Sequence, residues 1–170
     1  FLCGPIAMTA AARDTLIVES TYANRAHESV HDAEQKLGEL VTQVAARGGK
    51  VIIPSFAVGR AQEVVYALHQ LWREQKIPDI PIFVDSPLAV DATAVFRMHP
   101  EVFDRRERLV DDGHALFDFP LLRYVRSVIE SKKINAMNGP AVIIAASGMG
   151  ESGRVLHHVA NHAGDHRNCI

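Results

Sequence analysis

The sequence predicts an α/β fold with three layers, in which a mainly parallel sheet is flanked by helices. Two observations lead to this fold class. The 170-residue chain contains short, continuous apolar runs rich in β-branched residues, which are typical of strands buried on both faces of a parallel sheet. Between these runs, apolar residues recur at helical spacing. Strand and helix therefore alternate along the chain, as they do when helices connect parallel strands.

The predicted strands are the apolar runs themselves. A further segment, Leu121–Val128 (LLRYVRSV), alternates in the manner of a strand, although a helix also fits it, and another strand is expected to begin at Cys169. The four runs that define the sheet are Thr15–Val18 (TLIV), Val51–Ile53 (VII), Ile82–Val84 (IFV) and Ala141–Ala145 (AVIIA).

The predicted helices follow from apolar periodicity and from end signals. The first runs from Val30 to Ala45 and stops at the Gly48-Gly49 pair, a typical C-terminal signal. Residues 61–72 repeat in the same way. The remaining segments are a helix over Leu88–Met98, stopped by His99-Pro100; a short helix over Glu130–Met137; and a charge-dense, exposed helix end or loop over Asp104–Asp112.

Composition restricts the classes of function. With 18 Lys and Arg against 20 Asp and Glu, the formal charge is -2, which excludes polybasic, histone-like binding of nucleic acid. Most of the cations are Arg, whose planar fork matches phosphate oxygens. No apolar run is long enough to span a membrane, and no leader is recognised, so the sequence predicts a cytoplasmic protein without membrane contact. Cys3 and Cys169 are expected to be free thiols.

Hydroxyl residues follow each predicted strand. In an open parallel sheet, these strand ends lie along one edge, where ligands bind. Hydroxyls, backbone N–H groups and nearby Arg side chains suit oxyanions, above all phosphate. The structural alternative is that these Ser and Thr residues only cap the next helix. The segments are Glu19-Ser20-Thr21, Pro54-Ser55, Asp85-Ser86-Pro87 and Ala146-Ser147-Gly148.

Two of these turns carry further anion-binding features. In the segment 55–63 (SFAVGRAQE), Arg60 is expected in the first turn of a helix, where the helix dipole disfavours a cation unless an anion is present. In the segment 147–154 (SGMGESGR), three glycines and two serines form a loop whose N–H groups can surround an anion. Neither turn contains a P-loop or GxGxxG motif, so an ATPase or a dinucleotide enzyme is not supported.

Metal and nucleophile motifs are weak. Three histidines at positions 158, 162 and 166 recur at helical spacing, with His157 and Asp165 nearby, but there is no HExxH motif and Gly164 is expected to end the helix. No GxSxG elbow is present. The sequence therefore predicts no metal ligand within this chain.

Four segments, in order and spacing, resemble the β-CASP domain of RNA-processing metallo-β-lactamases. They are Ile17–Arg25 (IVESTYANR), Ile52–Leu68 (IIPSFAVGRAQEVVYAL), Ile82–Ala89 (IFVDSPLA) and Ile143–His158 (IIAASGMGESGRVLHH). This family includes the endonuclease subunit of the cleavage and polyadenylation specificity factor, and the chain is most similar to its bacterial members. The resemblance implies a Rossmann-like cap domain over residues 14–170, truncated at its C-terminal strand. Residues 1–13 are then expected to be a remnant of the neighbouring metallo-β-lactamase part or of the expression sequence.

The resemblance also implies a function. The full-length enzyme would hydrolyse RNA with two zinc ions held through an HxHxDH motif, which this sequence lacks, so the chain alone is expected to be inactive and to hold no cofactor. Glu19 would support a general-acid histidine in the missing half. The expected RNA contacts are Ser55, Arg60, Ser147, Gly148 and Arg154, and a second set to be considered comprises Ser20, Asp85, Ser86, His157 and His158.

Three hypotheses for function remain open at the level of sequence. The first is the RNA-binding cap domain of a zinc-dependent ribonuclease, with single-stranded RNA and the metallo-β-lactamase domain of its own parent chain as partners. The second is a Rossmann-like binder of a small phosphorylated ligand. The third is a docking or dimerisation module that forms a homodimer.

Overall fold

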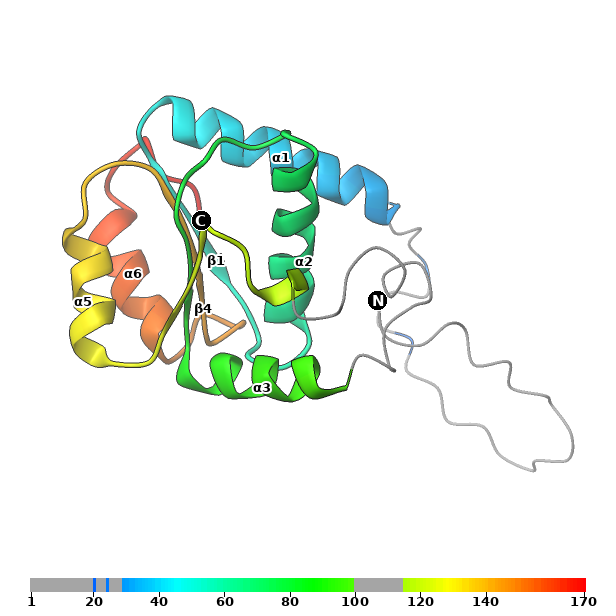
Figure 1. Ribbon diagram of the computed structural model, residues 1–170. Coiled ribbons are helices and arrows are strands. Elements are labelled where there is room, and N and C mark those ends of the chain that lie inside the picture. The colour runs from blue at the N-terminus through cyan, green and yellow to red at the C-terminus, as the bar shows by residue number, and fades with distance from the viewer. Residues whose placement is uncertain (1–19, 21–23, 25–28, 100–114) are drawn as a thin grey trace, which may run out of the picture.

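A parallel sheet with helices on both faces organises the chain in the computed structural model (Figure 1). The structure describes Ser20, Asn24 and residues 29–99 and 115–170. Within these residues lie four strands and five α-helices, which confirms the predicted α/β fold. The elements are α1 (Val30–Ala46), β1 (Lys50–Pro54), α2 (Arg60–Arg73), β2 (Ile82–Asp85), α3 (Pro87–Met98), a 3-10 turn (Ala115–Phe117), β3 (Leu122–Val125), α5 (Val128–Ala136), β4 (Ala141–Ala145) and α6 (Arg154–His162).

The strand order is β1-β4-β2-β3, and every described pair is parallel. β4 occupies the interior of the sheet, where Val142 is in register with Val51 on one side and with Ile82 on the other. Because all four strands run in the same direction, their carboxyl ends share one edge, at the bottom of Figure 1. We call this the carboxyl edge.

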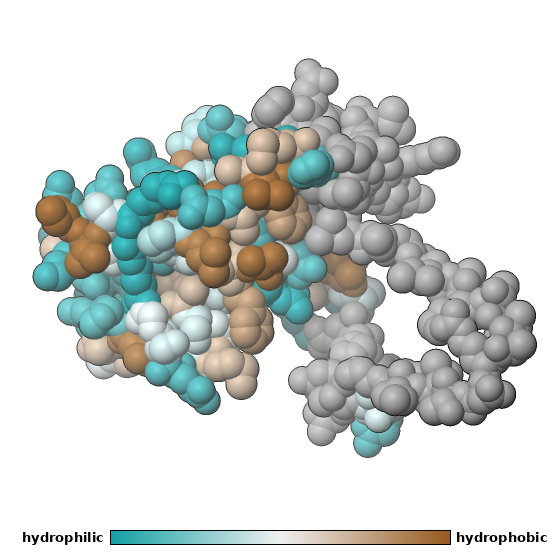
Figure 2. All heavy atoms as spheres, turned by 90° about the horizontal axis from the view of Figure 1, so that it is seen from below, coloured by the Kyte–Doolittle hydropathy of each residue, from teal (hydrophilic) through white to brown (hydrophobic). Residues whose placement is uncertain are grey.

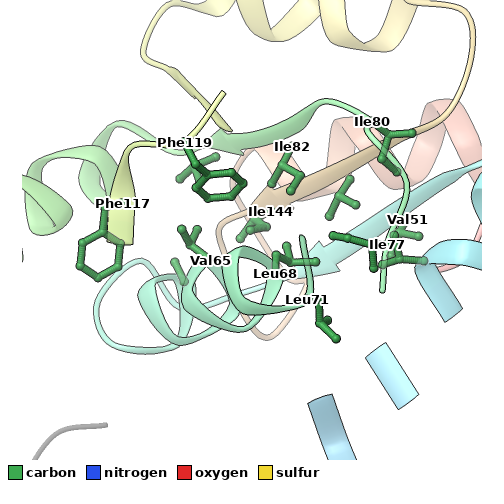
Figure 3. Packing of buried hydrophobic residues seen from close by; sticks show 14 of the residues in the cluster. Val51, Val65, Leu68, Leu71, Ile77, Ile80, Ile82, Phe117, Phe119 and Ile144 are labelled. Carbon is green, nitrogen blue, oxygen red and sulfur yellow. The ribbon is translucent and has the colours of Figure 1, made fainter. Parts of the chain in front are cut away.

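Alternate side chains of the strands enter two hydrophobic cores. On one face, Val51, Ile82 and Ile144 pack with α1 and α2, which contribute side chains such as Leu68 (Figure 3). On the other face, Ile143 and its neighbours pack beside Val155 of α6 and Ile134 of α5. Both faces are covered, which explains why the strands are continuous apolar runs.

Local signals set the ends of the helices. The Ser29 hydroxyl accepts a hydrogen bond from the Asp32 N–H and caps α1. At its other end, Gly48 has a φ of 71°, a left-handed conformation that glycine adopts without steric penalty. A capping box between Ser127 and Glu130 begins α5, and this signal was not used in the sequence prediction.

The ambiguous segment, Leu121–Val128, contains a strand followed by the first residue of a helix. β3 covers Leu122–Val125, and α5 begins at Val128. Cys169 forms a single parallel bridge to Val51, at the position where a new strand was predicted. The predicted strand Thr15–Val18 and the charged segment Asp104–Asp112 lie outside the described residues. In the described part of the chain, no helix is long and apolar enough to cross a membrane.

Candidate functional site

The carboxyl edge brings the ends of β1, β2 and β4 together. Ser55 follows β1 and Ser86 follows β2, and both line one small pocket with Ala146, the residue after β4. The other lining residues are small or aliphatic, so this pocket contains no charged side chain. Ser147 and Gly148 continue from Ala146 into the β4–α6 loop.

The serines that follow the strands differ in whether they cap the next helix. The Ser86 hydroxyl caps α3 by accepting from the Ala89 N–H at 3.2 Å, so the capping alternative is correct for this residue. It is not correct for Ser55 and Ser147, because Gly59 and Gly153 occupy the N-cap positions of α2 and α6. Ser55 is 2% exposed, and its hydroxyl donates to the Phe56 carbonyl at 3.2 Å.

A buried amide fixes the β1–α2 turn. The Gln62 Oε1 accepts from the Gly59 N–H at 2.8 Å, and its Nε2 donates to the Ala57 carbonyl at 3.2 Å. The same Nε2 lies 2.9 Å from Thr93 Oγ1 and 3.3 Å from the Ala89 carbonyl, both on α3. Gln62 is fully buried. The turn is therefore tied to α3 by a neutral side chain, a role that the sequence analysis missed although Gln62 stands at the third position of its helix.

Arg60 begins α2, as predicted, and its side chain lies at the surface. Its side chain is 66% exposed, and its Nη1 lies 2.9 Å from Glu63 Oε2, on a side chain that is itself 41% exposed. Surface pairs of this kind contribute about 0–1 kcal/mol. The guanidinium can therefore exchange Glu63 for an anionic ligand at little energetic cost.

The β4–α6 loop packs directly on the β1–α2 turn. A Cβ atom built on Gly148 would lie 2.9 Å from both the backbone N and the Cδ2 of Phe56. Real Cβ atoms do not approach this closely, so a glycine is required here. Gly153 at the end of the loop has a φ of 80°, and a Cβ there would lie 2.5 Å from the Ala146 carbonyl oxygen. Two turns that are distant in sequence thus form one continuous surface.

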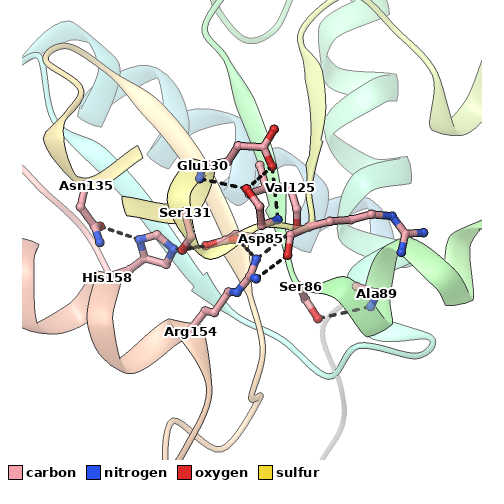
Figure 4. A network of polar contacts seen from close by, with 11 residues as sticks. Asp85, Ser86, Ala89, Val125, Glu130, Ser131, Asn135, Arg154 and His158 are labelled. Atoms are coloured by element: carbon pink, nitrogen blue, oxygen red, sulfur yellow. Dashed lines mark hydrogen bonds and ion pairs between the residues drawn. The ribbon is translucent and has the colours of Figure 1, made fainter. Parts of the chain in front are cut away.

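Arg154 is held inside the chain (Figure 4). Its Nη1 donates to Asp85 Oδ1 at 2.6 Å and lies 3.3 Å from the Val125 carbonyl oxygen, while its Nη2 donates to the Arg126 carbonyl at 2.5 Å. The side chain is only 18% exposed. These contacts join the start of α6 to the ends of β2 and β3.

Asp85 is the centre of this buried network. Its Oδ2 accepts from the Ser131 hydroxyl at 2.5 Å and lies 2.7 Å from His158 Nε2. His158 Nδ1 in turn lies 2.7 Å from Asn135 Oδ1. Asp85 and His158 have no exposed surface. Burial opposes the ionisation of Asp85, but hydrogen bonds from His158, Ser131 and Arg154 outweigh it and hold the pKa of this carboxyl below its ordinary value of 3.8.

Neighbouring groups complete the arrangement on α5 and α6. His162 is buried, its Nε2 lies 3.2 Å from Asn135 Oδ1, and burial together with the nearby Lys50 and His158 lowers its pKa. Ser131 and Asn135 were not predicted; their spacing of four residues on α5 was the only sequence signal that they share a face.

The other predicted residues are dispersed. His157 is exposed, and its carbonyl accepts from Asn161 Nδ2 at 2.6 Å. His166 is exposed beyond α6. Ser20 is also exposed, and Glu19 lies outside the described residues. Among the described residues, no three His, Cys, Asp or Glu side chains are grouped so as to hold a metal ion.

Comparison with known proteins identifies the relationship. A family model described as Beta-Casp domain matches residues 61–170, from the second residue of α2 to Ile170. The chain belongs to the β-CASP family. This confirms the resemblance inferred from the four sequence segments.

The β-CASP chain is also similar to parts of larger curated proteins. It is 33% identical over 158 residues to Ribonuclease TTHA0252 of Thermus thermophilus, a match that covers 92% of the chain and 36% of the relative. It is 39% identical over 161 residues to Transcription termination factor FttA of Pyrococcus abyssi, covering 92% of the chain and 24% of that protein. Endoribonuclease YSH1 of Saccharomyces cerevisiae is 34% identical over 146 residues, covering 82% of the chain and 18% of the relative. The chain thus spans about a third or less of the length of these relatives.

Zinc, which the family resemblance implies for the complete enzyme, does not fit the histidines of this β-CASP chain. Both ring nitrogens of His158 are already engaged, one with Asp85 and the other with Asn135. His162 contacts the same Asn135 oxygen. At the carboxyl edge, the described residues therefore present hydroxyl, guanidinium and backbone N–H groups, and no cluster of side chains suited to a metal ion.

Proposed function

We propose that this chain is the RNA-binding β-CASP domain of a zinc-dependent ribonuclease, and that single-stranded RNA crosses its carboxyl edge. The observation that carries the proposal is the contact between the β1–α2 turn and the β4–α6 loop, which places the exposed Arg60 and the glycine-rich loop on one surface. Two relatives, Ribonuclease TTHA0252 and Endoribonuclease YSH1, are named for action on RNA.

Within the proposal, the predicted residues divide into two groups. Arg60 contacts phosphate oxygens directly, because its guanidinium is exposed and weakly paired. From the loop, Ser147 offers its hydroxyl and Gly148 its backbone N–H, whereas the Ser147 N–H donates to the Ser152 carbonyl at 3.2 Å. Ser55 and Arg154 support these contacts from behind, since Ser55 is buried and donates to the Phe56 carbonyl, and Arg154 is bound to Asp85. Contacts of this kind position RNA without reading its sequence.

The catalytic chemistry is assigned to the part of the parent protein that this chain does not include. Residues 14–170 form the β-CASP domain in this proposal, and Glu19 supports a general-acid histidine from the partner domain. Two zinc ions bound by the metallo-β-lactamase domain would supply the activated water and stabilise charge on the phosphate. We therefore expect this chain alone to bind RNA but not to cleave it.

Binding measurements test the proposal. At low salt, single-stranded RNA should raise the Tm of the chain and bind in fluorescence anisotropy, and the affinity should fall steeply as salt is added. A nucleoside monophosphate at the same phosphate concentration should produce neither effect. Stabilisation by the mononucleotide alone would favour the small-ligand alternative. Absence of RNA binding at low salt, together with a dimer in light scattering, would favour the docking alternative.

A further inference from the structure

We infer that Phe56 is a stacking platform for an unpaired base of the RNA, a binding residue beyond the phosphate contacts proposed above. This inference rests on the proposed function. It assigns a binding residue for the base, whereas the contacts proposed above bind the phosphate. Its first support is exposure. Phe56 is 55% exposed, whereas Phe83, Phe117 and Phe119 are at most 8% exposed. A solvent-exposed aromatic ring does not gain the free energy of stabilisation that burial would give it.

The position of Phe56 is fixed from two directions. Its carbonyl accepts from the Ala61 N–H at 3.2 Å and from the Ser55 hydroxyl at 3.2 Å. Gly148 packs against the ring, since a Cβ there would lie 2.9 Å from Cδ2 and 3.1 Å from Cε2. The ring is therefore supported by a backbone without a side chain, and the residue remains 55% exposed. A preorganised platform of this kind loses little conformational entropy when a ligand binds.

The surroundings of Phe56 match a nucleotide. Arg60 lies four residues further along the chain, at the start of α2, and is exposed, and the Ser147–Gly148 segment touches Phe56 itself. Groups suited to phosphate thus flank a ring suited to a base. Two further apolar side chains, Val58 and Met149, are 61% and 68% exposed in the same two turns. Figure 2, which looks onto this edge, shows hydrophobic side chains among hydrophilic ones.

The charge of the chain favours a base as the occupant. With a formal charge of -2, the chain cannot rely on a broad electrostatic attraction to the backbone. Proteins that bind single strands combine backbone contacts with stacking on aromatic rings, and each stacked base contributes enough to change affinity by about fivefold or more. Stacking tolerates any base, so it adds affinity without sequence preference.

The experiment compares two oligomers and three variants by fluorescence anisotropy at fixed low salt. One oligomer is a short oligoadenylate, and the other has the same length of ribose-phosphate backbone without bases. Phe56→Leu keeps an apolar side chain but removes the aromatic face, whereas Phe56→Trp keeps that face. Ile170→Ala is the matched control, because Ile170 is an apolar residue with the same exposure as Phe56, 55%, and its neighbour Cys169 pairs with Val51 near the amino end of β1, away from the carboxyl edge. The Tm of each variant is measured to verify that it folds.

We expect the unsubstituted chain to prefer the oligoadenylate by about fivefold or more. Phe56→Leu should abolish this preference and leave the affinity for the abasic oligomer unchanged, and Phe56→Trp should retain it. Quenching of the new indole by the oligoadenylate, but not by the abasic oligomer, would report stacking directly. Ile170→Ala should behave as the unsubstituted chain.

The results separate this inference from the proposed function. Equal affinity of the unsubstituted chain for both oligomers, or an unchanged preference in Phe56→Leu, overturns the stacking platform while RNA backbone binding stands. Equal losses for both oligomers in Phe56→Leu also overturn it, because the ring would then act only through the fold of the turn. Failure of the unsubstituted chain to bind either oligomer overturns both proposals.

Discussion

Two arginines that each follow a glycine have opposite environments in this molecule. Arg60 and Arg154 each begin a helix after a strand, and each follows a glycine N-cap with left-handed φ, 82° at Gly59 and 80° at Gly153. The Arg60 side chain is 66% exposed and pairs with a neighbour on its own helix. The Arg154 side chain is 18% exposed and pairs with Asp85, which has no exposed surface.

The difference arises from what lies opposite each arginine. A cation at a helix N-terminus is unfavourable unless an anion compensates it. For Arg154 that anion is built into the fold, at the carboxyl end of β2. For Arg60 the compensation is a surface carboxylate, Glu63, whose attraction is weak in water. Arg154 therefore stabilises the edge, while Arg60 keeps its guanidinium accessible to the RNA that we propose as the ligand.

The largest expected effect concerns the buried pair. Asp85→Asn or Arg154→Ala leaves a charged group without its partner in the interior, and we expect the free energy of unfolding to fall by about 3–5 kcal/mol. Urea denaturation monitored by circular dichroism measures this. Arg60→Ala in the same assay should change stability by less than about 1 kcal/mol. Similar losses in the free energy of unfolding for the Arg60 and Arg154 variants would contradict the inference that Arg154, and not Arg60, stabilises the fold.

Acid should weaken the buried pair of Asp85 and Arg154 over a defined range of pH. The pKa of Asp85 is below its ordinary value of 3.8 in the folded chain, so its contribution is complete above about pH 4 and is lost as pH falls through the folded-state pKa. We expect the free energy of unfolding of the unsubstituted chain to decrease below pH 4, and Asp85→Asn to show a smaller decrease. Identical pH profiles for the two proteins would show that Asp85 does not titrate as inferred.

Sequence patterns were sufficient for three of the four described strands and for most of the helices. The apolar runs identified β1, β2 and β4, because the central residues of these strands are buried on both faces and are all apolar. Arg60 was also placed correctly, since its position depends only on the start of α2. The environment of Arg154 was not predictable from its neighbours, because Asp85 lies 69 residues earlier in the chain. Gln62, Ser131 and Asn135 escaped notice for the same reason: their partners are set by tertiary packing.

A smaller effect is expected from the contact that joins the two turns. Gly148→Ala places a methyl group 2.9 Å from the backbone N of Phe56, and the backbone must move to admit it. We expect a loss of about 1–3 kcal/mol in the free energy of unfolding, together with weaker RNA binding. Gly164→Ala is the control, because a Cβ at Gly164 meets no atom within 4 Å. An RNA affinity unaffected by Gly148→Ala would show that the two turns need not touch to bind RNA.

The last substitution, Arg60→Gln, should have the smallest effect on the free energy of unfolding. It also tests most directly whether the carboxyl edge binds phosphate. The measurement is the dependence of single-stranded RNA affinity on salt concentration, for the unsubstituted chain, Arg60→Gln and Arg73→Gln. Arg73 is the matched control, because it is an exposed arginine at the opposite end of the same helix. We expect Arg60→Gln to reduce the slope of log affinity against log salt by about 0.7, the value for one phosphate contact on a single strand, and Arg73→Gln to leave it unchanged. An unchanged slope for Arg60→Gln, or an equal reduction for both variants, would contradict the account.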